Sequence, residues 1–143
     1  MNPIPEEIKS EIWENFQKMQ EIQIATIDND KPRLRPITLI FHNEKFWILT
    51  GTDSAKTKQI QENPNIEFCH LLKKDPDTGY IRANGIAKII QDRDTKEELA
   101  NQVDYFKSYW KGVDDPNYTL LEIEITEIEY MKPGEYAGQR YLI

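Results

Sequence analysis

The spacing of apolar residues changes along the chain from a helical period to a strand period. Ile8, Ile12 and Phe16 recur at helical spacing, and Pro5 suits the first position of a helix. From residue 22 onward, β-branched and aromatic residues gather in short runs that turn-forming residues separate. The sequence therefore predicts one amphipathic helix followed by a mainly β fold.

Six runs have the composition of strands. They cover residues 22–27, 33–41, 46–50, 65–72, 80–90 and 118–131. The turns between the first three are short, which favours three consecutive antiparallel strands. Gly85 interrupts the fifth run, where it indicates a bulge or a bend. In the sixth run Leu121 and Ile123 alternate with Glu122 and Glu124, which predicts a last, half-exposed strand.

Two further helices are predicted between the strands. Residues 54–62 form a basic, helix-like segment that stops at Asn63-Pro64. The other helix is predicted, after Asp94 or Thr95 as the N-cap, by apolar residues spaced four, three and four apart. These residues are Leu99, Val103, Phe106 and Trp110. The expected fold is a single domain over residues 1–143, mainly β with flanking helices, arranged as a small closed barrel.

Composition narrows the classes of function. The formal net charge is −7, from 18 Lys and Arg against 25 Asp and Glu. A nucleic-acid binder needs a clustered excess of Lys and Arg, so that class is excluded and any anion site must be local. The single cysteine cannot form an internal disulfide, and the N-terminal residues lack the basic start and apolar run of a secretion signal. No apolar run approaches the roughly 20 residues of a membrane span, so we expect a cytoplasmic protein with no membrane partner.

The segment ILTGTDSAKTKQIQENP contains a candidate anion site. Thr50, Thr52 and Ser54 lie in the connection between a strand and a helix, toward which the first N–H groups of the helix point. Lys56 falls in the first helical turn, where a cation opposes the helix dipole, and a bound phosphate would explain it. The alternative is that Asp53 or Ser54 only caps the helix and that Lys56 is solvated.

The strand PRLRPITLIF carries a second candidate feature. Arg35, Ile37 and Leu39 share one face of the strand, so a guanidinium lies beside an apolar surface. Such a face suits a planar ligand with a charged tail. Pro36 cannot donate a ladder hydrogen bond, which indicates an edge or bulged position with free backbone groups. The alternative is an exposed arginine beside an edge strand.

Three segments in order, RPITLIF, FWILTGTDSAKTKQIQENPNIEFC and GIAKIIQD, resemble a known family. They look like the FMN-binding split barrels of the pyridoxamine 5′-phosphate oxidase superfamily, nearest to its general-stress-protein branch, from about residue 22 to residue 131. The resemblance implies a split β-barrel of six or so antiparallel strands with Greek-key-like connections, and a bound FMN. The C-terminal EYAGQRYLI does not match the substrate-binding end of the vitamin oxidases, so pyridoxamine phosphate is not the expected substrate.

The resemblance also implies ligand contacts. Arg35 and Lys56 match residues that contact the flavin phosphate, and Ser54 matches a hydroxyl of the same loop. Five residues match the strands that run along the flavin ring, namely Pro36, Ile37, Thr38, Leu49 and Thr50. At two positions where the vitamin oxidases carry phosphate-side cations, this chain has Ile40 and Ala55.

The same resemblance implies a two-fold homodimer with flavins at the shared interface. Tyr80, Asn84 and Trp110 are then candidates to reach the flavin of the neighbouring subunit, although a core anchor is the alternative for Trp110. We expect an FMN-dependent oxidoreductase of unknown substrate, in which the flavin supplies the hydride chemistry and a nicotinamide is a candidate donor. The alternative is a non-enzymatic module that holds a flavin, haem or another flat anion. Neither version predicts a catalytic side chain, and Cys69 and His70 point to opposite faces of a strand, so no metal site is predicted.

Overall fold

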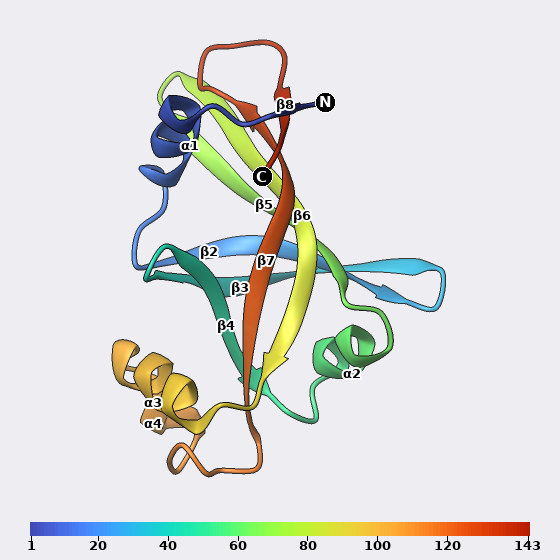
Figure 1. Ribbon diagram of the computed structural model, residues 1–143, viewed down its shortest axis with the longest axis vertical. Helices are drawn as coiled ribbons and strands as arrows, with labels where there is room; N and C mark the ends of the chain where they lie inside the picture. Colours follow the sequence, from blue (N-terminus) through green and yellow to red (C-terminus); the bar gives the residue numbers. More distant parts are fainter.

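Figure 1 shows the fold in the computed structural model, which describes residues 1–143. The strands are β1 (Asn2–Pro3), β2 (Met19–Asp28), β3 (Lys31–His42), β4 (Lys45–Gly51), β5 (Asn65–Lys74), β6 (Asp77–Ile90), β7 (Tyr118–Met131) and β8 (Gln139–Leu142). The helices are α1 (Glu6–Trp13), α2 (Ala55–Glu62), α3 (Arg93–Gln102) and α4 (Phe106–Tyr109). The six predicted strands correspond to β2 to β7, and most of them are longer than predicted.

Strands β2 to β7 close into a ring. Their order is β7-β4-β3-β2-β5-β6, and β6 pairs back with β7. Every pairing within the ring is antiparallel. In Figure 1 the long strands β6 and β7 run along the length of the molecule, while the β2–β3 pair runs across them. The predicted fold, a mainly β split barrel with flanking helices, is confirmed.

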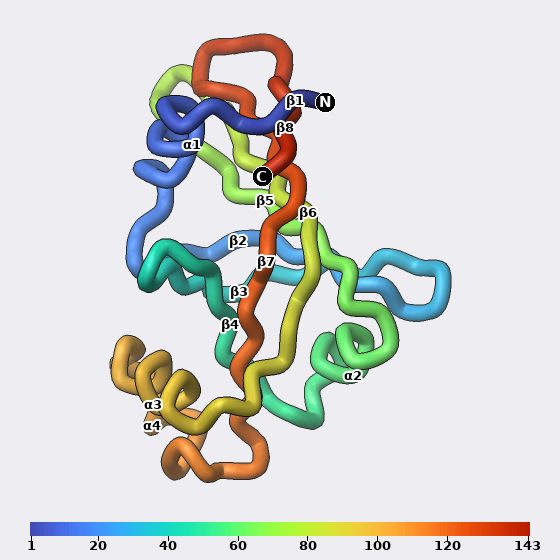
Figure 2. The backbone as a smooth tube through the Cα atoms, viewed as in Figure 1, coloured from blue at the N-terminus to red at the C-terminus, as the bar shows by residue number.

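The sequence pattern does not predict β1 and β8, so the strand over residues 118–131 is not the last one. β8 pairs with residues Glu127–Tyr130 of β7, and β1 pairs in parallel with β8. Both are short strands. They form because β4 pairs with β7 only as far as Ile123, which leaves the rest of that β7 edge open to β8. Figure 2 shows the consequence, which is that the two ends of the chain lie close together.

Two apolar clusters hold the elements together. The larger one has 18 buried residues, fills the barrel and includes Ile12 and Phe16 from α1 and the turn after it. The second has 10 buried residues and lies between α3–α4 and the outer side of β3, β4 and β7. Leu39 and Ile40 are neighbours on β3, yet each enters a different cluster, because successive side chains of a strand point to opposite faces. The second cluster fixes α3 and α4 beside β4.

The bulge predicted at Gly85 is present. The register between β6 and β7 shifts there, so that Asn84 faces Glu127 while Gly85 faces Ile125. A Cβ atom on Gly85 would lie 1.9 Å from the carbonyl oxygen of Glu124. The two backbones approach so closely that only glycine fits at this position.

The apolar residues whose spacing predicted one helix around 99–110 lie on two helices. α3 ends at Gln102, Val103 has an extended backbone with φ −118° and ψ 126°, and the single turn of α4 follows. All the residues of that pattern, Leu99, Val103, Phe106 and Trp110, still enter the second cluster. Packing on β4 and β7, rather than helix propensity, therefore decides where the helix ends.

The N-cap predicted for this helix is also wrong. The cap is Asp92, whose carboxylate accepts the backbone N–H of Thr95 at 3.0 Å, and not Asp94 or Thr95. None of the four helices is both long and apolar enough to cross a membrane.

Candidate functional site

A gap opens in the ring where β3 and β4 separate. β3 pairs with β2 along Lys31–Ile40, but it pairs with β4 only over Ile40–His42. β4 continues against β7 as far as Gly51. One edge of β3 and one edge of β4 therefore face the gap without a strand partner, and their backbone N–H and C=O groups are free to meet a ligand. Pro36 lies on this edge of β3, as its missing N–H predicts.

The gap forms a groove with a volume of about 460 Å³. Seven of the predicted site residues line it, namely Pro36, Ile37, Thr38, Leu49, Thr50, Lys56 and Trp110. We call Pro36–Thr38 and Leu49–Gly51 the strand-edge wall. The sequence reasoning missed Gly51, Tyr105 and Tyr109, which complete the lining. With Trp110, these tyrosines form the aromatic wall, and their spacing of four residues in DYFKSYW is the only signal that could have pointed to them.

Two neighbouring cations have no carboxylate partner: Lys56, which lines the groove, and Arg35, which is not among the lining residues but precedes Pro36 on β3. Arg35 is half-buried and donates to Thr26 Oγ1 at 2.9 Å and to Gln59 Oε1 at 3.1 Å, both neutral acceptors. Lys56 is also half-buried and forms no ion pair and no side-chain hydrogen bond. Burial lowers the pKa of both side chains, and repulsion by Arg35 lowers the pKa of Lys56 further. Placing two uncompensated cations together is unfavourable unless an anion binds between them.

The hydroxyl groups of the loop before α2 are already paired. Ser54 is the N-cap, since its Oγ accepts the N–H of Thr57 at 3.4 Å and lies 2.9 Å from Thr57 Oγ1. Thr57 Oγ1 also lies 2.8 Å from the carbonyl oxygen of Gly51, to which it donates. The alternative role of Ser54, which is to cap the helix, is therefore correct. Capping does not explain the position of Lys56. Thr52 does not line the groove, because its hydroxyl bonds Thr119 and the carbonyl of Pro116 on another side of the loop.

The two positions that depart from the vitamin oxidases differ in their surroundings. Ile40 is fully buried in the second cluster beneath α3 and α4, where an unpaired charge would be costly. Ala55 is exposed at the start of α2. Lys56 is therefore the one cation in the groove lining, with Arg35 near it on β3.

Trp110 is a core residue that also reaches the groove. Its side chain is 6% exposed and packs on Phe106 and Tyr118 with ring centroids 5.2 Å and 5.3 Å apart. Its indole N–H donates to the carbonyl of Asn117 at 2.8 Å. The core-anchor interpretation is thus correct, and the indole still contributes to the lining.

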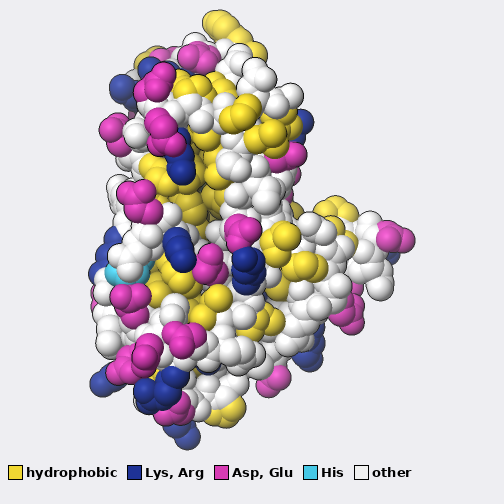
Figure 3. All heavy atoms as spheres, in the orientation of Figure 1, with side chains coloured by type: hydrophobic (Ala, Val, Ile, Leu, Met, Phe, Trp, Pro, Cys, Tyr) yellow, Lys and Arg dark blue, Asp and Glu magenta, His cyan; other side chains and the backbone are white.

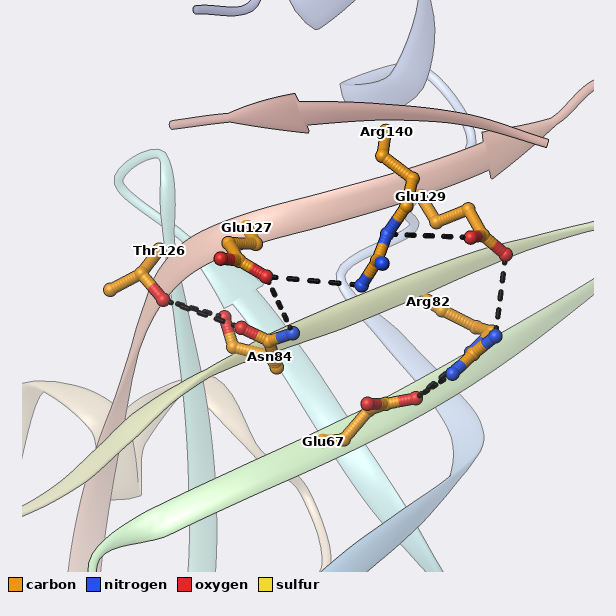
Figure 4. A network of polar contacts seen from close by, with 7 residues as sticks. All are labelled: Glu67, Arg82, Asn84, Thr126, Glu127, Glu129 and Arg140. Atoms are coloured by element: carbon orange, nitrogen blue, oxygen red, sulfur yellow. Dashed lines mark hydrogen bonds and ion pairs between the residues drawn. The ribbon is translucent and has the colours of Figure 1, made fainter. Parts of the chain in front are cut away.

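Tyr80 and Asn84 lie apart from the groove, in a polar network on the outer side of β5 to β8. Figure 4 shows the part of this network around Asn84, in which Arg82 bridges Glu67 and Glu129, and Arg140 reaches across to β7. Asn84 donates to Glu127 at 3.2 Å, and the Tyr80 hydroxyl donates to Glu129 at 2.6 Å. Neither residue lines the groove of its own chain. Their contact with a flavin of a neighbouring subunit stays a prediction.

The lining limits what the groove can do by itself. Lys56 and two tyrosines are its only ionisable groups, so it contains no His, Cys, Asp or Glu to act as a nucleophile or as a general base near neutral pH. Its two walls, with Lys56 in the lining and Arg35 near it, suit a flat, largely apolar ligand with an anionic tail. Any chemistry beyond binding would have to come from that ligand.

Comparisons with known proteins identify relatives in sequence and in fold. The family model described as pyridoxamine 5′-phosphate oxidase matches residues 8–132. General stress protein 26 of Bacillus subtilis (strain 168) is 27% identical over 133 residues, which cover 91% of this chain and 92% of that protein. The crystal structure of General Stress Protein 26 from Bacillus anthracis str. Sterne has a TM-score of 0.76 at 26% identity, over 95% of this chain and 98% of that chain. A heme binding protein from Mycobacterium smegmatis shares the fold, with a TM-score of 0.71 at 11% identity, over 87% of this chain and 53% of that chain.

Proposed function

Since the chain belongs to the pyridoxamine 5′-phosphate oxidase family, whose members commonly bind FMN, we propose that the groove between β3 and β4 is an FMN site. The observation that carries the proposal is a pair of neighbouring cations without a carboxylate partner, Lys56 in the groove lining and Arg35, which precedes the lining residue Pro36 on β3. A phosphate would neutralise both, and a charge-assisted hydrogen bond to phosphate is about twice as strong as a neutral one. The residues present therefore fit the group.

The two walls of the groove have separate roles in this proposal. The free edges of the strand-edge wall would hydrogen-bond the polar rim of a flat ring, while Ile37 and Leu49 would pack on its apolar part. Arg35 and Lys56 would hold the phosphate, and Gln59 keeps the Arg35 guanidinium in place. When bound, the flavin would supply hydride transfer to and from a second molecule. The chain itself would contribute position, charge and exclusion of water, and no side chain needs to act as an acid or a base.

We further propose that the protein works as a two-fold homodimer. The β2–β3 hairpin projects from the body as an arm, which is visible at the right of Figure 3. On this arm Leu34 is 69% exposed, and at the groove Tyr109 is also 69% exposed. Apolar surface of this kind, next to strand edges that lack a partner, suits burial against a second copy of the chain.

A module that binds a flat ligand without turnover is the second candidate. One observation favours it, because a solved structure with the same fold is a heme binding protein. The absorption spectrum of the purified protein distinguishes the two ligands, because the visible absorption bands of a flavin differ in position from the intense main band of haem. We expect yellow protein that releases FMN on denaturation. A colourless protein that does not take up added FMN would contradict the FMN site.

Turnover is tested separately from binding. Anaerobic addition of NADH or NADPH to the flavin-loaded protein should bleach the yellow colour, and an electron acceptor should restore it over repeated cycles. The control is free FMN at the same concentration. A protein that binds FMN tightly but is not reduced faster than free FMN by either nicotinamide would support the binding module over the nicotinamide-dependent oxidoreductase.

A further inference from the structure

Arg35 differs from every other arginine of the chain in its hydrogen-bond partners. The others each form an ion pair with at least one Asp or Glu, and they are Arg33, Arg82, Arg93 and Arg140. The side chain of Arg35 forms two hydrogen bonds, both to neutral acceptors. Carboxylates are not scarce, because the chain has 25 Asp and Glu against 18 Lys and Arg. The guanidinium of Arg35 is therefore held in place without being neutralised.

The two acceptors form a closed group with the guanidinium. Nη1 of Arg35 donates to Thr26 Oγ1 at 2.9 Å, and Nη2 donates to Gln59 Oε1 at 3.1 Å. The hydroxyl of Thr26, a residue that is 1% exposed, donates to the same Oε1 at 2.5 Å. Because a guanidinium has only donors, the oxygen of the Gln59 amide must face it, and this fixes the orientation of the amide. We call Thr26 of β2 and Gln59 of α2 the neutral frame.

The neutral frame holds the charge of Arg35 near Lys56. Gln59 and Lys56 are three positions apart on α2, so they are neighbours on the surface of this helix. Arg35 is close enough to Lys56 to lower the pKa of its amine, although burial is the larger cause. Lys56 lines the groove, and Arg35 precedes the lining residue Pro36 on β3. An anion that reaches Lys56 in the groove therefore lies near Arg35 as well.

The neutrality of the frame matters because a carboxylate in place of the amide would change the electrostatics. An amide and a carboxylate of the same length can both accept the N–H groups of Arg35, but only the carboxylate compensates its charge. A compensated Arg35 attracts an anion less, and the added negative charge repels one. The amide of Gln59 thus orients the guanidinium and preserves its attraction for an anion.

We propose that Thr26 and Gln59 make the groove selective for an anionic ligand, because they orient Arg35 without neutralising it. Neither residue lines the groove, so both are positioning residues that act through Arg35. The inference deepens the proposed function and rests on it, because the ligand selected is the phosphate ester FMN. The ligand rejected is riboflavin, which has the same ring and side chain but no phosphate.

Titration of the flavin-free protein with FMN and with riboflavin tests the inference. Gln59→Glu should weaken FMN binding about 10- to 100-fold and change riboflavin binding by less than about twofold. Thr26→Val removes one hydrogen bond to Arg35 and should weaken FMN binding about two- to tenfold, whereas Thr26→Ser, which keeps the hydroxyl, should bind like the wild type. The matched control is Gln61→Glu, which adds the same charge to an exposed position of α2 and should leave both affinities unchanged.

The ratio of the two affinities separates positioning from a structural role. Damage to the fold or to the groove would weaken both flavins in parallel, so a parallel loss in Gln59→Glu would overturn the inference. An FMN affinity that is unchanged in Gln59→Glu or in Thr26→Val would also overturn it. Wild-type protein that binds riboflavin as tightly as FMN would refute the selection for an anion, while the flavin site itself would stand.

Inorganic phosphate decides the inference if the protein binds no flavin and the proposed function fails. Phosphate should then still raise the melting temperature of the wild type more than chloride at the same ionic strength, because an anion that binds only the folded protein stabilises it. Gln59→Glu should lose this difference, and Gln61→Glu should keep it. A phosphate effect that is absent in the wild type, or equal in Gln59→Glu, would overturn the inference.

Discussion

Replacing Lys56 by alanine removes the one charged residue of the groove lining and leaves the packing of α2 intact. Lys56 is half-buried, forms no ion pair and precedes the buried Thr57 and Ile60, which anchor the helix. Its lowered pKa, caused first by burial and then by repulsion from Arg35, means that the charged form is disfavoured in the free protein. Removing it should therefore not lower the stability of the flavin-free protein.

The expected effect on FMN binding follows from the contact that would be lost. A hydrogen bond to a charged group contributes about 1.5 to 3 kcal/mol, so the Kd for FMN should rise about 10- to 150-fold in Lys56→Ala. The matched control is Lys58→Ala, which lies on the same helix and removes the same charge from an exposed position. Long-range electrostatics alone would affect both variants equally, whereas a direct phosphate contact affects Lys56 only.

Fluorescence titration of each apoprotein with FMN measures the FMN affinity of the two variants, because flavin emission changes on binding. A thermal melt of each apoprotein tests whether the substitution changes its stability. An FMN affinity in Lys56→Ala equal to that of Lys58→Ala would show that Lys56 does not contact the phosphate. A large fall in the melting temperature of flavin-free Lys56→Ala would contradict the statement that its charge is unfavourable in the free protein.

Three further predictions concern the barrel and its assembly. Gly85→Ala should lower the free energy of unfolding by about 3 kcal/mol, because its Cβ would meet the carbonyl of Glu124, whereas Gly112→Ala, with nothing within 4 Å, should be near neutral in the same urea titration. Burial and the hydrogen bond to Glu11 raise the pKa of Tyr130 to about 12, so the stability that its neutral form contributes is present below pH 10 and is lost as the pH rises toward 12. Urea titrations across this range should show the loss in the wild type and a smaller loss in Tyr130→Phe. Sedimentation of the flavin-loaded protein should show a dimer, and a monomer that retains FMN would mean that the site is complete within one chain.

Local pattern was enough to predict the barrel strands and much of the groove. Strand periodicity located β2 to β7, and the missing N–H of Pro36 indicated the free edge at which the groove opens. Lys56 was identified because a cation in a first helical turn opposes the dipole of its own helix. These signals depend on neighbouring residues and on backbone chemistry, so they can be read without knowing the fold.

Where the structure differs from the sequence-based predictions, interactions between distant parts of the chain are the cause. The break at Val103, the N-cap at Asp92 and the strands β1 and β8 all depend on a surface that another segment supplies. Tyr80 and Asn84 lie in a polar network of their own chain, beside the bulge at Gly85 and the acidic side chains of β7, and their contact with a flavin of a neighbouring subunit stays a prediction.

The sequence by itself determined the barrel strands β2 to β7, the family and the strand-edge half of the groove, because each follows from spacing, turn chemistry or a motif within a few tens of residues. Only the tertiary structure decided the rest. Tyr105 and Tyr109 reach the same groove as Lys56 because α3 and α4 pack through the second cluster onto β4 and β7, although about fifty residues separate them from Lys56 in the chain. Arg35 is held by Gln59 for the same reason, since the closure of the ring brings α2 against β2 and β3. Such contacts depend on how apolar surfaces fit together in three dimensions, and no periodicity along the chain encodes that fit.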